Sequence, residues 1–187
     1  MQEHHLLLKL DFKNAFNCLR RDKMLAAVSE KAPELFPLIH SAYGTPFSLF
    51  IGDTIIQSSE GIQQGDQLGP LLFCLTTMEI MEQLRSELII FYLDDRTLGR
   101  SLEDITQDLQ IVEREAEKLG LHLNHAKSEI ISHDHRAVMS MLEAVPGLYP
   151  VRPELATLLG SPIGGEEGVN KSISERTEAL RVMGDRL

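Results

Sequence analysis

The chain has 187 residues, 43% of them hydrophobic and 25% charged, which is enough to bury a core as one domain or as a large part of a bigger one. Its apolar runs are too short to cross a bilayer and its N-terminus lacks the order of a signal peptide, so we expect an intracellular protein without membrane contacts. The formal net charge of -10 argues against unaided binding to a polyanion such as DNA, because such binding depends largely on Lys and Arg at the phosphates.

The first segment with a clear pattern is LLLKLDF, in which leucines lead up to Asp11. This pattern predicts a strand that ends at Asp11. A short polar turn follows, and the segment DKMLAAVSEKA predicts a helix with Asp22 as its N-cap. The two cysteines, Cys18 and Cys74, lie far apart without CxxC spacing. We therefore expect no disulfide scaffold and no thiolate zinc site, and we expect both thiols to be buried.

The middle of the chain predicts a short helix, a hairpin, a Gly-rich loop and a longer helix. The segment ELFPLIHSAY predicts the short helix, and PFSLFIGDTIIQSSEG predicts two strands around a turn at Gly52 and Asp53. The loop GIQQGDQLGP follows, with Pro70 near the first turn of the helix LGPLLFCLTTMEIMEQLRSE. Apolar residues crowd almost every face of this helix, so we expect it to be deeply buried.

The clearest predicted helix covers residues 101–119, with Ser101 and Asp104 as a capping box and Gly120 as the C-terminal cap. The segment LHLNHAKSEIIS then predicts two short strands, HRAVMSMLEAV another helix and ATLLGSPIG a last strand. We interpret the acidic side of the 101–119 helix as a solvated surface, formed by Glu103, Asp108, Glu113, Glu115 and Glu117.

A further apolar strand, LIIFYL, stops at two adjacent acids, Asp94 and Asp95, and RTLG is expected to return as its hairpin partner. A carboxylate at the end of a buried strand is costly to desolvate unless it is compensated, and divalent metal ions compensate it strongly. Asp11 ends another apolar strand. We expect the two strands to be neighbours in one sheet, so that Asp11 and Asp94 converge and a bridging cation would relieve their repulsion. Each acid taken alone is equally compatible with a turn former.

Five segments, taken together and in this order, resemble the palm motifs of reverse transcriptases, most closely those of non-LTR (LINE-type) retrotransposons. They are LKLDFKNAF, EGIQQGDQLGPLLF, FYLDD, GLHLNHAKSEII and LLGSPIG, and they cover residues 6 to about 165. The resemblance implies an α+β fold with an antiparallel sheet backed by helices in a split βαβ topology. Residues 1–165 would form this palm, and residues 166–187 a polar C-terminal tail whose helical pattern lacks a full apolar stripe.

The resemblance also implies a two-metal chemistry. Asp11 and Asp94 would bind two Mg²⁺ ions, with Asp95 completing the acidic cluster and Mn²⁺ able to substitute. One metal would lower the pKa of the primer 3′-hydroxyl, and both would stabilise charge during in-line phosphoryl transfer. Lys127 matches the lysine of the family that protonates the leaving pyrophosphate. The implied partners are an RNA or DNA template with its primer, and deoxynucleoside triphosphates.

Further positions match the substrate-binding residues of the family. Phe16 matches the aromatic gate that crowds the sugar 2′ position, although taken alone it is equally an ordinary core aromatic. Gln64 and Gly65 match the loop beside the incoming nucleotide and the template. Leu159 and Gly160 match the hairpin that holds the primer end.

The sequence departs from the family pattern at Gln67, where the family usually has Pro, and in two further respects. Arg96 follows the acids where a small residue is usual, and its guanidinium could pair with a carboxylate and compete with the metal. The basic fingers segment and the thumb of the family are expected to be missing. We therefore expect this palm fragment, by itself, to have weak polymerase activity or none.

The residues leave other functions open. The chain could be a non-catalytic retroelement remnant that acts as a folded interaction module. A small sheet-based RNA-binding module would call for exposed aromatics and basic strands, which the 5% aromatic content and the charge of -10 disfavour. A zinc site is disfavoured because the histidines have no cysteine nearby; these include His122, His125, His133 and His135.

Overall fold

The computed structural model describes residues 5–184, and its core is a five-stranded sheet in the order β4-β5-β1-β6-β7. All neighbouring strands in this sheet are antiparallel except β6 and β7, which are parallel. The predicted α+β fold, an antiparallel sheet backed by helices, is confirmed. The strands of the sheet are β1 (Leu6–Leu10), β4 (Leu88–Tyr92), β5 (Asp95–Arg100), β6 (Glu129–Ile131) and β7 (Tyr149–Val151).

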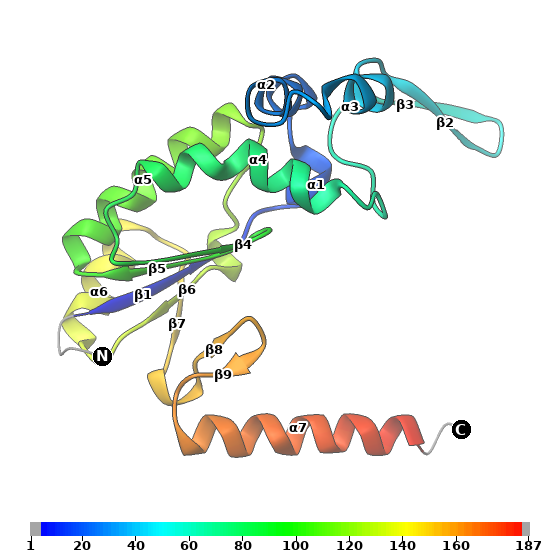
Figure 1. The fold of residues 1–187 in the computed structure, drawn as a ribbon. Coiled ribbons are helices and arrows are strands. Elements are labelled where there is room, and N and C mark those ends of the chain that lie inside the picture. Colours follow the sequence, from blue (N-terminus) through cyan, green and yellow to red (C-terminus); the bar gives the residue numbers. More distant parts are fainter. Residues whose placement is uncertain (1–4, 185–187) are drawn as a thin grey trace.

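Helices α4 and α5 cover one face of this sheet, whereas the C-terminal helix α7 lies on the other side (Figure 1). Alternate residues of β1, namely Leu6, Leu8 and Leu10, are buried in one cluster with Phe73 of α4 and Ile105 of α5. The face of β1 formed by every second residue therefore packs against the apolar faces of α4 and α5. The helices are α1 (Ala15–Cys18), α2 (Arg21–Lys31), α3 (Phe36–Tyr43), α4 (Gly69–Glu82), α5 (Leu102–Lys118), α6 (His135–Ala144) and α7 (Glu166–Gly184).

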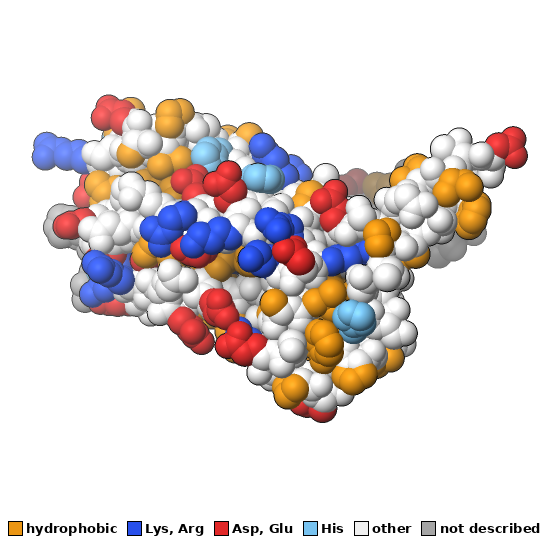
Figure 2. Space-filling model, turned by 90° about the horizontal axis from the view of Figure 1, so that it is seen from above, with side chains coloured by type: hydrophobic (Ala, Val, Ile, Leu, Met, Phe, Trp, Pro, Cys, Tyr) orange, Lys and Arg blue, Asp and Glu red, His pale blue; other side chains and the backbone are white. Residues whose placement is uncertain are grey.

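A hairpin of β2 (Phe47–Ile51) and β3 (Thr54–Ser58) stands out from the body of the molecule (Figures 1 and 2). We call this hairpin the arm. Its turn lies at Gly52 and Asp53, as predicted, and Gly52 adopts a positive φ of 58° that glycine accepts without strain. Hydrophobic side chains gather along the arm in Figure 2. The exposed ones are Leu49, Phe50, Ile51, Ile55 and Ile56.

The segment ATLLGSPIG forms a small hairpin rather than the single strand that we predicted. Its strands are β8 (Thr157–Leu158) and β9 (Ser161–Pro162). They pair because Leu159 (φ 47°) and Gly160 (φ 76°) both adopt the left-handed conformation of a tight two-residue turn. Helix α7 follows within the predicted polar tail. Within residues 5–184, no helix combines the length and the apolarity that crossing a membrane requires.

Several local predictions are wrong. Helix α2 begins at Arg21 with Arg20 at the N-cap, and Asp22 instead accepts two hydrogen bonds from the Arg20 guanidinium (3.0 and 2.7 Å). Helix α4 is not buried on all sides, because it packs against α2 and the core and leaves Leu71 and Met78 exposed. The predicted burial of both thiols fails as well: Cys18 is half-buried and Cys74 is exposed.

Asp108 is fully buried, which corrects its assignment to a solvated surface. Its carboxylate accepts hydrogen bonds from the backbone N–H groups of Arg85 and Ser86 and from the Ser86 hydroxyl, at 2.6 to 3.1 Å. These donors compensate the buried charge, and the contact fixes the connection between α4 and β4.

The segment LHLNHAKSEIIS forms one strand, β6, rather than the two strands that we predicted. The short 3-10 helix η1 (His125–Lys127) precedes this strand.

Candidate active site

Three acids lie at one edge of the sheet. Asp11 follows β1, Asp94 lies in the two-residue turn between β4 and β5, and Asp95 begins β5. The expectation that the strands before Asp11 and Asp94 are direct neighbours is wrong, since β5 lies between β1 and β4. Both strands are antiparallel to β5, however, so they run in the same direction and end at the same edge. We call this part of the sheet the acid edge.

The strand register brings Asp11 and Asp95 close together. Leu10 pairs with Arg96 in the antiparallel ladder between β1 and β5, so the next position sets Asp11 opposite Asp95. Burial raises the pKa of Asp95 above its usual range, and the charges of Asp94 and Asp11 add to this effect while Lys9 opposes it. Burial is the larger cause of the raised pKa, and the repulsion among the carboxylates, which a cation at this edge would relieve, adds to it.

The acid edge is not by itself a closed metal cage. In the part of the chain that the structure describes, no three His, Cys, Asp or Glu side chains stand close enough together to hold an ion. Mg²⁺ typically takes only one or two carboxylates from a protein and completes its octahedron with water and substrate phosphates. The carboxylates of Asp11, Asp94 and Asp95 are the type of ligand that such a Mg²⁺ ion takes from a protein.

The segment that carries Lys127 fixes the backbone of Asp11. The Asp11 N–H donates to the Ser128 hydroxyl (3.2 Å), and the Asn124 N–H donates to the Asp11 carbonyl (2.8 Å). Ser128 is fully buried, so this anchor is shielded from water. Lys127 lies in η1 between the two anchors with an exposed side chain, and its ammonium has no hydrogen-bond or ion-pair partner among residues 5–184.

Arg96 does not pair with the acids, which corrects the expectation that its guanidinium competes with the metal. Its side chain is 1% exposed and lies between the rings of Phe12 and Phe91, at 4.6 and 4.3 Å from their centroids. None of its three guanidinium nitrogens has a hydrogen-bond partner within the described residues. Burial lowers the pKa of Arg96 to about 10, against the raising effects of Cys74 and Asp94.

Phe16 lies beside the start of the Gly-rich loop, residues 61–66. Its ring stacks on Phe73 of α4 with 4.8 Å between the centroids and remains half-buried. Its carbonyl accepts a hydrogen bond from the N–H of Ile62 (2.7 Å). Gly61 has a positive φ of 73°, and a Cβ there would come within 2.4 Å of the Asn17 carbonyl oxygen, so the close approach of loop and α1 requires glycine.

Two residues without a predicted role, Tyr43 and Asp66, hold this loop. The hydroxyl of Tyr43 donates to the Asp66 carboxylate and accepts from the N–H of Gln63 (3.3 Å). Asp66 also accepts from the N–H of Leu68 (2.8 Å), at the start of α4. The position of Asp66 just before a helix was a usable sequence signal, because Asp commonly bonds backbone N–H groups there. Tyr43 carried none.

Arg21 ties the loop to the base of the arm. Its guanidinium donates to the Gly61 carbonyl (2.9 Å), to the Ser58 carbonyl (2.7 Å) and to the Ser58 hydroxyl (3.0 Å). It also lies over the rings of Tyr43 and Phe47, at 5.3 and 5.0 Å from their centroids. A buried arginine with this many partners fixes the arm, α2 and the loop relative to one another.

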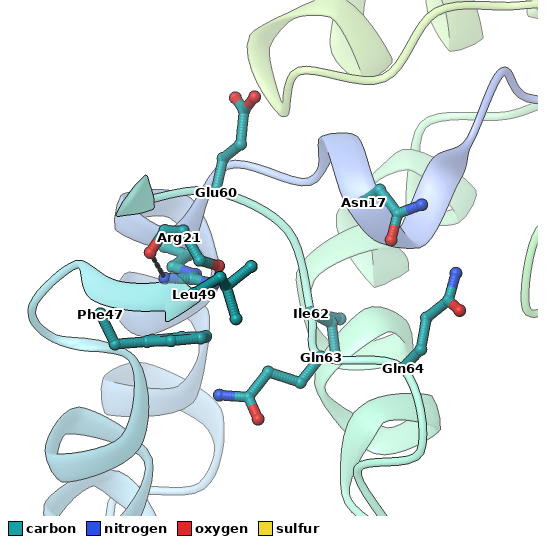
Figure 3. A pocket seen from close by; sticks show the side chains of 9 residues that line it. Asn17, Arg21, Phe47, Leu49, Glu60, Ile62, Gln63 and Gln64 are labelled. Carbon is teal, nitrogen blue, oxygen red and sulfur yellow. Dashed lines mark hydrogen bonds between the residues drawn. The ribbon is translucent and has the colours of Figure 1, made fainter. Parts of the chain in front are cut away.

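A cavity of ≈ 400 Å³ opens between the arm, α1 and the loop (Figure 3). We call it the loop cavity. Gln64, one of the predicted nucleotide-binding residues, lines it together with Gln63. The other predicted loop residue, Gly65, adopts a positive φ of 88° and is exposed beside Gln64. Further lining residues are Asn17, Arg21, Phe47, Leu49, Ser58, Glu60 and Ile62.

The predicted primer-holding turn faces the acid edge. Leu159 and Gly160 form one wall of a small cavity of ≈ 100 Å³, and Lys9 and Asp95 belong to the same lining. The carbonyl of Gly160 accepts a hydrogen bond from Arg176 of α7 (2.6 Å), which ties the turn to the C-terminal helix. The structure thus brings the β8–β9 turn and Asp95 together, although they lie more than sixty residues apart in the sequence.

Comparisons with known proteins agree with this arrangement. The family model described as "Reverse transcriptase (RNA-dependent DNA polymerase)" matches residues 1–163. The "Retrotransposable element SLACS 132 kDa protein" of Trypanosoma brucei gambiense is 29% identical over 137 residues, covering 67% of this chain and 12% of that protein. Two structures of a telomerase from Candida tropicalis share the fold. The apo structure has a TM-score of 0.58 at 12% identity, and the structure in complex with a TWJ fragment of telomeric RNA has 0.56 at 15%.

The matched region is a small part of these larger proteins. It covers 72% and 70% of this chain but only 30% and 26% of the two telomerase chains. At these identities the telomerase structures establish the fold alone. The family model covers most of the chain. The chain therefore belongs to the reverse transcriptase (RNA-dependent DNA polymerase) family.

Proposed function

We propose that this chain is the palm of a non-LTR retrotransposon reverse transcriptase and supplies the residues for RNA-templated or DNA-templated addition of deoxynucleotides. The observation that carries the proposal is the convergence of Asp11, Asp94 and Asp95 at one edge of the sheet, where Asp95 shares a small cavity with the turn at Leu159 and Gly160. The retrotransposon protein that resembles this chain supports the origin. The proposed polymerase activity is that of a complete enzyme of which this palm is a part; for the chain alone we expect weak activity or none.

Asp11 and Asp94 would hold two Mg²⁺ ions, with Asp95 beside them. When bound, the ions supply Lewis acidity at the phosphates and at the attacking hydroxyl. The raised pKa of Asp95 supports its place in this cluster, because crowding and burial leave that carboxyl short of compensating charge. Lys127 would give its proton to the leaving pyrophosphate. Its exposed side chain belongs to the segment between Asn124 and Ser128, whose ends fix the backbone of Asp11.

The other residues would position the substrates. Phe16, half-buried on Phe73, would limit the space at the sugar 2′ position. Gln64 and Gly65 would contact the incoming nucleotide from the loop that Tyr43 and Asp66 hold. Leu159 and Gly160 would hold the primer end near the acids. Holding the reactants in line in this way accounts for much of the rate of phosphoryl transfer.

The test is metal-dependent nucleotide binding. We expect a fluorescent deoxynucleoside triphosphate to bind the purified chain in the presence of Mn²⁺ and to be released by EDTA. The Asp94→Asn variant should lose this binding, whereas Asp53→Asn, at the exposed turn of the arm, should keep it. Binding that is independent of Mn²⁺, or equal in the wild type and Asp94→Asn, would refute the proposed site.

A further inference from the structure

A lysine and a glutamate form an ion pair beside the acid edge. Lys9 of β1 precedes Asp11 by two residues, and its ammonium lies 2.5 Å from the carboxylate of Glu129 on β6. We propose that this ion pair sets the affinity of the acid edge for a divalent metal, because Glu129 holds the Lys9 ammonium away from the acids. The proposal rests on the proposed function, which makes the acids metal ligands, and it assigns Lys9 and Glu129 a positioning role.

Lys9 lies on the same face of the sheet as Asp11. Leu8, Leu10 and Phe12 are buried in the core cluster under the helices. Side chains alternate along a strand, so the two residues between them, Lys9 and Asp11, point to the opposite face. Two positions along a strand correspond to about 7 Å, and the long side chain of Lys9 can therefore reach the Asp11 carboxylate.

The ladder between β1 and β5 sets Lys9 diagonally opposite Asp95. Lys9 pairs with Thr97, and Asp95 lies two positions away on the same face of β5. Diagonal neighbours of this kind are roughly 7–8 Å apart, within reach of a long side chain. Lys9 and Asp95 also line one cavity beside the turn at Leu159 and Gly160. Burial and the neighbouring acids raise the pKa of the Asp95 carboxyl, and the charge of Lys9 lowers it.

Glu129 draws the ammonium to the other side of β1. The strand order sets β5 on one side of β1 and β6 on the other, and Lys9 pairs directly with Glu129 in the β1–β6 ladder. The ion pair therefore directs the Lys9 side chain toward β6 rather than toward Asp95. The side chains of Lys9 and Glu129 are only 24% and 31% exposed, so water and salt screen this pair less than a pair on the open surface.

A divalent metal and the Lys9 ammonium would supply positive charge to the same carboxylates. While Lys9 is paired with Glu129, the two charges largely cancel, and the acids stay available to a metal. Without the Glu129 carboxylate, the ammonium can turn to Asp95 or Asp11, and a metal has to displace it. One full charge at about 7 Å changes the affinity for a cation by roughly threefold or more.

Calorimetric titration of charge variants with Mn²⁺ tests the role of the ion pair. We expect Glu129→Gln to weaken Mn²⁺ binding by roughly threefold or more, and Lys9→Met to strengthen it by a similar factor. The double variant Lys9→Met/Glu129→Gln and the charge-conserving variant Lys9→Arg should both bind Mn²⁺ as the wild type does. Effects in opposite directions identify the charge as the cause, since a purely structural role would weaken binding in both single variants.

A second ion pair of the same kind provides the matched control. Lys31 of α2 and Glu79 of α4 also lie 2.5 Å apart, but they belong to the helices and not to the sheet. Lys31→Met and Glu79→Gln change the net charge by the same amounts and should leave the Mn²⁺ affinity unchanged, because salt screens distant charges. Equal effects from the two ion pairs would overturn the proposal, because net charge alone would then explain them.

The contact of Lys9 with the acids can also be measured without metal. In EDTA, urea denaturation gives the free energy of unfolding for Lys9→Met in the wild-type background and in the Asp95→Asn background. Loss of the bond to Glu129 is common to both backgrounds and cancels in this cycle. We expect Lys9→Met to cost more stability while Asp95 is present. Equal costs in the two backgrounds would overturn the proposal.

The failure of this proposal is distinguishable from the failure of the proposed function. If Asp94→Asn loses Mn²⁺ binding while Lys9→Met and Glu129→Gln bind Mn²⁺ as the wild type does, the ion pair has no role and the acid edge stays in place. If the wild type and Asp94→Asn bind Mn²⁺ equally, the acid edge is not the metal site, and both proposals are overturned.

Discussion

Asp95 and Arg96 are adjacent in the sequence, yet their side chains lie on opposite faces of the sheet. Asp95 belongs to the acid edge, while the guanidinium of Arg96 is buried between Phe12 and Phe91. The alternation of side chains along β5 produces this separation. It leaves the guanidinium of Arg96 buried with no hydrogen-bond partner among residues 5–184.

Replacing Arg96 should stabilise the fold. Burial lowers the pKa of Arg96 to about 10 in the folded state, so folding disfavours the charged form that predominates at neutral pH. We expect Arg96→Met to raise the free energy of unfolding by about 1 kcal/mol or more, after the loss of contacts with the two rings is subtracted. Urea denaturation measures this. The control Arg20→Met, an exposed arginine paired with Asp22, should stay within about 0.5 kcal/mol of the wild type. A clear loss of stability in Arg96→Met would show that the ring contacts outweigh burial.

Tyr43 should make stability fall at alkaline pH. Burial, followed by the hydrogen bond to Asp66, raises the pKa of Tyr43 to about 12, so the folded state holds the phenolic proton more tightly than the unfolded state. This contribution is fully present below the usual pKa of about 10 and is lost as pH rises toward 12. We expect Tyr43→Phe to be less stable than the wild type at pH 8, by about 1 kcal/mol for the lost hydrogen bond. The difference should shrink above about pH 10. A constant difference across this range would contradict the raised pKa.

Phe16→Ala should relax sugar selectivity if the side chain crowds the 2′ position. In the Mn²⁺-dependent binding assay, the affinity for a ribonucleoside triphosphate should rise relative to the deoxy form by roughly tenfold, as expected for the removal of a steric contact. Because Phe16 also stacks on Phe73, some loss of stability is expected as well. The ratio of the two affinities separates the roles, and an unchanged ratio would leave Phe16 as a core residue.

The purified chain should bind primer and template weakly. Its net charge is -10, Arg21 and Arg96 are buried, and Lys9 is paired with Glu129 at 2.5 Å. Few cations near the acid edge are therefore free for phosphates, and affinity should fall as salt rises. We expect little extension of oligo(dT) on poly(rA) by the chain alone with Mn²⁺. Robust extension that Asp94→Asn abolishes would contradict this expectation.

The sequence was informative where structure depends on local periodicity. The leucines of β1, the turn at Gly52 and the cap at Ser101 were all predicted and found, because each follows from residues close together in the chain. The motifs also predicted that the acids lie at one edge of the sheet, as the strand directions in the structure have them. The exact strand order was not predicted, since neither β1 nor β4 specifies that β5 lies between them.

Long-range contacts of polar residues account for the remaining errors. Asp108 has the spacing of a solvated helix face, but it is buried by a loop 22 residues away in sequence. The contact of Tyr43 with Asp66 joins segments 23 residues apart and has no periodic signal. Whether Arg96 pairs with an acid or is buried depends on its face of the sheet, and therefore on a register that only the folded structure defines.

Calorimetric titration with Mn²⁺ tests the central claim, that Asp11 and Asp94 hold a divalent metal at the acid edge. We expect Asp11→Asn and Asp94→Asn each to weaken Mn²⁺ binding by roughly tenfold or more, because each removes a charged ligand. Both should also raise stability in the absence of metal by relieving repulsion with Asp95. Asp53→Asn, at the turn of the arm, should change neither quantity. Equal Mn²⁺ affinity in the wild type and in both acid variants would contradict the account.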